Sequence, residues 1–158
     1  MKASLKTFLP FLVLLCGMLS LQAQTFPQNS QTLGVKNNWT RNDLMEPAKL
    51  AALIKDPRSA KPAIFNIGVV ENIKGAKYIG AADKKENLVR FKKTLSSLPK
   101  TASIVIYCGC CPFGRCPNIR PALQVLKDGG YTNAKLLNLP TNLQTDWVNK
   151  GYPLEKLE

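Results

Sequence analysis

The chain has 158 residues, with 22 lysines and arginines against 10 aspartates and glutamates, five cysteines and no histidine. This length favours one compact domain, and a composition of 45% hydrophobic and 20% charged residues is typical of a globular protein. The lack of histidine excludes Ser-His-Asp and Cys-His catalytic designs and every metal site that needs an imidazole. Catalysis would therefore depend on cysteine, lysine or a carboxylate.

Residues 1–23 have the pattern of a secretory signal peptide. Lys2 and Lys6 precede an apolar run over residues 8–21, which is shorter than the ~20 apolar residues of a membrane span. We expect cleavage after Ala23, followed by export to the periplasm or secretion, without stable membrane insertion of the mature protein. The alternative is a lipoprotein anchored through Cys16.

The remaining chain is basic, but its charges are dispersed. It keeps 20 basic and 10 acidic residues, and the tightest basic groups are Lys84-Lys85 and Lys92-Lys93 on one predicted helix. Such a distribution indicates a solvated face, so we expect no nucleic-acid partner. The positive field still favours small anions near any site that it surrounds.

A polar extension over residues 24–44 precedes the predicted folded domain at 45–158. Within that domain, Leu88, Phe91 and Leu95 recur on one helical face, and short apolar runs bounded by proline or glycine fit buried strands. Strands that alternate with helices in this way indicate right-handed crossovers and a mostly parallel sheet between two helical layers. The predicted elements, in chain order, are a helix over 46–55, strands over 63–67 and 76–79, a helix over 84–98, a strand over 103–107, a helix from 117 or 118 to 128, a strand over 134–139 and a helix over 141–150.

The four cysteines beyond the signal peptide lie in one stretch, Cys108-Gly-Cys110-Cys111-Pro-Phe-Gly-Arg-Cys116. This stretch follows the strand over 103–107, and ligands of parallel sheets bind at the carboxyl ends of the strands. Backbone amides and a helix N-terminus at such a place lower a thiol pKa, which makes Cys108 a candidate thiolate. A lone buried cysteine is more often inert, but four cysteines in nine residues favour a functional loop. The expected anion-stabilising residues are Gly109, Gly114, Arg115 and Arg120.

Four segments of the chain form a recognisable set: the strand ending in Cys108 (104–108), the helix with its following Gly-Tyr (122–131), the closing Trp-x-x-x-Gly-Tyr-Pro (147–153) and Ile-Lys-Gly-Ala (73–76). In these segments the chain resembles the rhodanese-like sulfurtransferase domains, over roughly residues 45–153. The resemblance implies a single three-layer α/β domain with a five-stranded, mostly parallel sheet. It also implies a persulfide on Cys108 that takes sulfane sulfur from a small anionic donor such as thiosulfate and gives it to a thiol or other nucleophile. We expect no cofactor.

Three departures from the family pattern bear on the chemistry. Asn66-Ile67-Gly68 stands where the family's first core strand usually ends in Asp-x-Arg, and Asn72 stands where a histidine is usual. The loop from Cys108 to the next helix is also longer than the family's usual loop. The longer loop leaves Cys110, Cys111 and Cys116 open as resolving thiols or alternative sulfur acceptors.

Two other functions remain open at this point. Cys108 and Cys111 form a Cys-x-x-Cys pair suited to thiol-disulfide exchange. The four thiolates of Cys108, Cys110, Cys111 and Cys116 would also suit copper(I) or zinc, or form a structural clasp. A phosphatase or arsenate reductase is excluded, because no cysteine is followed by an arginine at the Cys-x5-Arg spacing.

Overall fold

The computed structural model describes residues 38–155. The predicted signal peptide at 1–23 and most of the predicted extension at 24–44 lie outside the described residues, so both stay predictions. None of the helices that the described residues form combines the length and the apolar character that a bilayer crossing requires.

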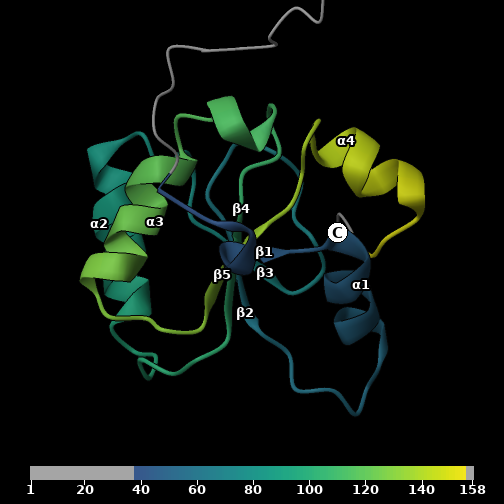
Figure 1. Ribbon diagram of the computed structural model, residues 1–158, viewed down its shortest axis with the longest axis horizontal. Coiled ribbons are helices and arrows are strands. Elements are labelled where there is room, and N and C mark those ends of the chain that lie inside the picture. Colours follow the sequence, from purple (N-terminus) through teal and green to yellow (C-terminus); the bar gives the residue numbers. More distant parts are fainter. Residues whose placement is uncertain (1–37, 156–158) are drawn as a thin grey trace, which may run out of the picture. The chain divides into compact units, whose positions relative to one another are not determined.

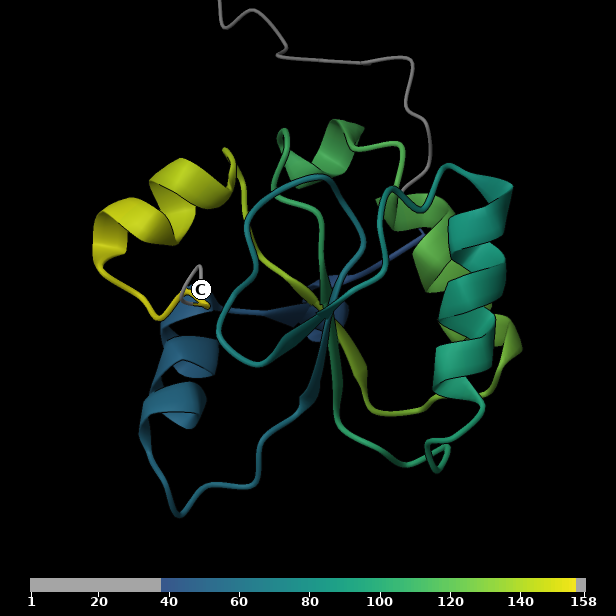
Figure 2. The same cartoon turned by 180° about the vertical axis from the view of Figure 1, so that it is seen from behind.

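The described residues form a parallel five-stranded sheet with the strand order β1-β5-β4-β2-β3 (Figures 1 and 2). The strands are β1 (Leu44–Met45), β2 (Ala63–Asn66), β3 (Ala76–Tyr78), β4 (Ile104–Tyr107) and β5 (Ala134–Leu137). β4 lies in the middle of the sheet, and all four of its residues are buried. The predicted α/β fold with 104–107 as a central strand is therefore confirmed.

Two helical layers cover the sheet (Figure 1). The helices α2 (Lys85–Leu95) and α3 (Ile119–Asp128) lie on one face, and α1 (Pro47–Lys55) and α4 (Leu143–Asp146) lie on the other. Along β4, Ile104 and Ile106 point into the core under α2 and α3, whereas Val105 and Tyr107 point to the other core. Because side chains alternate along a strand, this period places the next residue, Cys108, on the α2 and α3 side.

Two elements differ from the predictions. β1 was not predicted as a strand; it is only two residues long and exists because Leu44 pairs with Leu136 of β5. The helix predicted over 141–150 is broken at Trp147, which has φ −129° and ψ −61° and separates α4 from a short 3-10 turn at Val148–Lys150. The indole of Trp147 is fully buried and donates to the Pro153 carbonyl at 3.0 Å. Burial of this ring therefore overrides the helical pattern.

Candidate active site

Cys108 is the first residue beyond β4, and only 1% of it is exposed. Gly68, just after β2, packs directly against it. A Cβ atom at position 68 would lie 2.7 Å from both the Sγ and the carbonyl oxygen of Cys108, so only glycine fits there. Gly68 was noted in the sequence as a departure from Asp-x-Arg, but not as a site residue. The structure gives the departure a physical meaning, because the missing side chain makes room for the sulfur.

Asn118 holds the sulfur from the other side. Its Nδ2 donates to Cys108 Sγ at 3.2 Å, and its Oδ1 accepts from the Asp83 amide at 2.9 Å. The second bond fixes which end of the side chain faces the sulfur, so Asn118 presents a donor and not an acceptor. Asn118 is also the N-cap of α3, which places the sulfur at the positive end of that helix. The sequence marked this residue only as a possible helix start.

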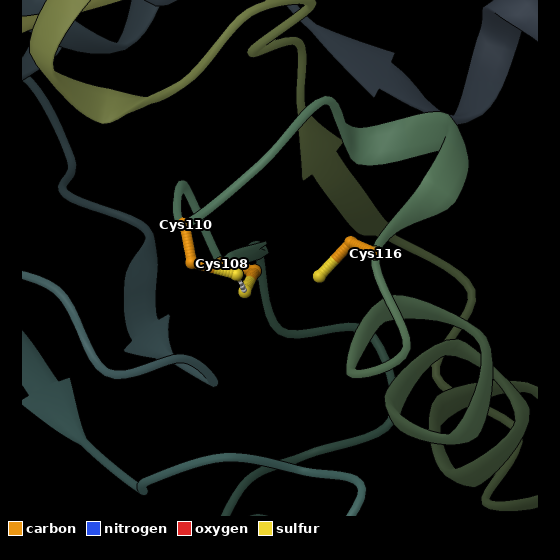
Figure 3. Close-up of side chains that lie close together, drawn as sticks. All are labelled: Cys108, Cys110 and Cys116. Carbon is orange, nitrogen blue, oxygen red and sulfur yellow. Dashed lines mark hydrogen bonds between the residues drawn. The ribbon is translucent and has the colours of Figure 1, made fainter.

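The four thiols lie close together in the loop after β4, and Figure 3 shows three of them, Cys108, Cys110 and Cys116. Cys110 Sγ lies 3.2 Å from Cys108 Sγ, and the Sγ atoms of Cys108, Cys110 and Cys116 all lie within 4.8 Å of one another. Cys111 contacts Cys110 at 3.4 Å. Cys108 and Cys116 are buried, Cys110 is exposed and Cys111 is half-buried, and all four are free thiols. Three sulfurs in this arrangement could hold a soft ion such as copper(I).

The hydrogen bonds around Cys108 favour its thiolate. Donation by the Cys116 thiol has the largest effect, and burial opposes it. The Cys110 amide, the Asn118 side chain and the Cys110 thiol donate as well, and together they lower the pKa of Cys108 to about 5. Burial and the neighbouring thiols raise the pKa of Cys110 to about 12, and donation to Cys108 raises the pKa of Cys116. Among Cys108, Cys110 and Cys116, the surroundings therefore favour the thiolate on Cys108.

The predicted anion stabilisers shape the loop. Gly109 has φ +74°, its carbonyl accepts from the Leu143 amide at 2.9 Å, and a Cβ there would lie 2.7 Å from the Leu143 Cβ. The Arg120 guanidinium donates to the Gly114 carbonyl at 3.1 Å and lies over the ring of Trp39. Arg115 is exposed on the 3-10 turn Phe113–Arg115. A direct role of these four residues in anion binding stays a prediction.

A cleft of about 360 Å³ lies beside the exposed thiol of Cys110. Its walls come from the cysteine loop, from Val69, Val70 and Glu71 after β2, and from the segment 142–144 that begins α4. The cleft therefore borders Cys110 directly, whereas Cys108 does not line it.

No protein-family model matches the chain, and no curated protein matches it significantly. Solved structures of EanB share its fold. A variant of EanB with a cysteine persulfide, in a tetrahedral intermediate state with ergothioneine, is 22% identical with a TM-score of 0.50 and covers 72% of this chain and 28% of that chain. Another variant, in complex with hercynine, is 22% identical with a TM-score of 0.51 and covers 78% of this chain and 29% of that chain. This chain therefore spans less than a third of the length of these EanB chains.

Proposed function

We propose that this protein is a sulfur-transfer enzyme that carries sulfane sulfur as a persulfide on Cys108, in the manner of the rhodanese-like domains that its sequence resembles. One observation carries the proposal: a buried cysteine sulfur at the carboxyl end of the central strand receives hydrogen bonds from Asn118, Cys116 and the Cys110 amide. The fold shared with EanB, which carries a cysteine persulfide in the first structure described above, supports it.

The reaction needs no histidine, because these donors keep Cys108 ionised without a general base. In the loading step the Cys108 thiolate attacks the outer sulfur of a donor such as thiosulfate. A new S–S bond forms, the donor's S–S bond breaks, and sulfite leaves with the bonding electrons. In the delivery step an acceptor thiolate takes the outer sulfur, and Cys108 leaves again as a thiolate. Each step conserves electrons without an oxidant, a metal or a cofactor.

The donors around Cys108 assist both steps. A thiol with a low pKa is a good leaving group in sulfur exchange, and this is the role of Cys108 when the persulfide is discharged. Asn118 acts as a positioning residue, since its bond to the Asp83 amide fixes the donor that faces the sulfur. The proposal further includes export through the predicted signal peptide, and a thiol acceptor or reductant as the partner in the outer compartment.

The test measures loading of the reduced protein by intact mass and by cyanide-trapped sulfur after incubation with thiosulfate. We expect the wild type to gain one sulfur atom and Cys108→Ser to gain none. Cys111→Ser is the matched control, since its thiol lies in the same loop but contacts Cys110, and it should load like the wild type. Full loading of Cys108→Ser would assign the sulfur to another cysteine. A reduced wild type that loads from no sulfane donor, but retains copper(I) in native mass spectra, would replace sulfur transfer by metal binding at Cys108, Cys110 and Cys116.

A further inference from the structure

The two thiols that touch each other most closely in the cluster differ in accessibility. Cys108 is 1% exposed, whereas Cys110 is exposed and borders the cleft beside the loop. Their sulfurs are 3.2 Å apart. A sulfur atom held on Cys108 is therefore within reach of Cys110, and Cys110 is far more accessible than Cys108 to an acceptor larger than the small sulfur donor.

We propose that Cys110 is a second sulfur-carrying residue, which takes the sulfane sulfur from Cys108 and presents it to an acceptor thiol bound in the adjoining cleft. The inference rests on the proposed persulfide at Cys108 and deepens it, because it names the route by which the sulfur leaves. Cys116 cannot serve in this way, since it is fully buried. Cys111 is half-buried, and its sulfur contacts that of Cys110.

The transfer step is balanced within the protein. The Cys110 sulfur attacks the outer sulfur of the Cys108 persulfide, a new S–S bond forms on Cys110, and the S–S bond on Cys108 breaks. Cys108 leaves as a thiolate with the bonding electrons, and the proton of the Cys110 thiol moves to the transferred sulfur. The donors from Asn118 and Cys116 stabilise the thiolate that is released, which makes Cys108 a good leaving group in this step.

The cleft indicates the class of acceptor. Val69, Val70 and Leu143 supply apolar contacts, Asn142 and Gln144 carry amide groups, and Glu71 is the one charged side chain among the lining residues. A carboxylate and two amides suit a small thiol that bears ammonium and peptide groups. The negative charge of Glu71 disfavours an acceptor that carries only negative charge. The acceptor that fits is therefore an amino-acid or short-peptide thiol.

The experiment separates loading from delivery. Reduced protein is loaded with thiosulfate, freed of donor, and mixed with glutathione as the probe, and the persulfide remaining on the protein is followed by intact mass. Loading of Cys110→Ser is measured first, and its delivery rate is normalised to the loaded fraction, because the Cys110 thiol also donates to Cys108. Delivery by Cys110→Ser should be at least about tenfold slower than by the wild type, because attack between neighbouring sulfurs is replaced by attack of glutathione on a less accessible sulfur. Cys111→Ser should deliver at the wild-type rate.

Two results would overturn the relay. One is delivery by Cys110→Ser at the wild-type rate. The other is release of free sulfide before glutathione is added, with a Cys108–Cys110 disulfide left behind, since this means that Cys110 attacks the inner sulfur. Alkylation and peptide mapping of loaded wild type provide an independent readout, which should find the extra sulfur on both residues. If the proposed function itself fails, neither the wild type nor any variant loads, so the two failures are distinguishable.

Discussion

Two loops meet at the carboxyl edge of the sheet, and they are held in different ways. The β2 loop (residues 67–73) is tied by polar side chains of the core: Asn66 makes three hydrogen bonds, and the Tyr107 hydroxyl makes two. The backbone of the cysteine loop (residues 108–118) is held through the Gly109 and Gly114 carbonyls, but its sulfurs are held by weaker thiol contacts and by Asn118. We therefore expect substitutions in the β2 loop to change mainly the stability of the fold, and substitutions in the cysteine loop to change mainly the reactivity of Cys108.

The largest expected effect concerns the charge on the cysteine loop. Since its neighbours lower the pKa of Cys108 from near 9 to about 5, the reduced protein should show the ultraviolet absorbance of one thiolate at neutral pH. Acidification should remove this signal with a midpoint near the lowered pKa, because protonation of Cys108 follows when the pH falls through it. Cys108→Ser should lack the signal. A wild-type signal that appears only around the ordinary cysteine pKa of about 8.5 would contradict the assignment.

A substitution that removes hydrogen bonds from the β2 loop should lower the free energy of unfolding. Asn66→Asp keeps the side-chain shape and the acceptor for the Gly68 amide, but it removes the donors to the Val70 carbonyl at 2.7 Å and to Asn72 Oδ1 at 3.0 Å. Because Asn66 is fully buried, we expect the free energy of unfolding in urea to fall by on the order of 3 kcal/mol.

The matched control for this substitution is Asn87→Asp. Its side chain is half-buried and donates one bond, to the Ala81 carbonyl at 2.9 Å. The same change there should cost about 1 kcal/mol. Equal losses at the two positions would mean that the β2 loop is not specially braced, and the contrast between the loops would disappear.

In the cysteine loop, substitution of Asn118 should change the pKa of Cys108, by a smaller amount than its neighbours together do. Asn118→Ala removes the donor to Cys108 Sγ, and a hydrogen bond to a charged group is worth roughly 1.5–3 kcal/mol. The pKa of Cys108 should therefore rise by about one to two units, as measured by the same thiolate titration. Asn118→Asp retains the acceptor for the Asp83 amide but turns a carboxylate toward the sulfur, so it should raise this pKa further. An unchanged titration midpoint in both variants would assign Asn118 a purely structural role.

The sequence predicts those strands and helices whose hydrophobic residues recur in a clear local pattern. The apolar runs at 63–67 and 103–107 become β2 and β4, and the resemblance supplied the total of five strands. The strand β1 could not be predicted, because Leu44 and Met45 are extended only through their pairing with β5. The end of α4 was also beyond local pattern, since it depends on where the Trp147 ring is buried.

The candidate site also has one part that the sequence predicts and one part that it does not. The position of Cys108 at the end of β4 follows from the strand pattern, but its partners do not. Gly68 and Asn118 reach the sulfur from segments that are distant in sequence. Cys110, Cys111 and Cys116 were all left open as partners of Cys108, and sequence spacing could not select the Cys110 contact, because it depends on the positive φ with which Gly109 turns the chain.

The smallest predicted effect concerns the hydrogen bonds that the Tyr107 hydroxyl makes to the end of the β2 loop, at Glu71 and Ile73. The Tyr107 hydroxyl accepts from the buried Ile73 amide at 2.9 Å and donates to the Glu71 carbonyl at 3.1 Å. Tyr107→Phe leaves that amide without its acceptor, so stability should fall by about 1 kcal/mol, and hydrogen exchange at the Ile73 amide should accelerate. The thiolate titration should stay unchanged, because the phenylalanine ring still fills the core on the face of β4 opposite to Cys108.

Tyr131→Phe is the matched control for this last substitution. It deletes the same atom from another buried tyrosine, whose hydroxyl donates to the Leu95 carbonyl at the end of α2. A similar loss of stability is expected there, since one buried bond is removed, but exchange at the Ile73 amide should stay slow. If both variants accelerate exchange at Ile73 equally, the effect is global unfolding and the Tyr107 brace has no local role. If only Tyr107→Phe does so while the thiolate persists, the two loops are held independently, and the wall of the cleft can open without disturbing the charge on Cys108.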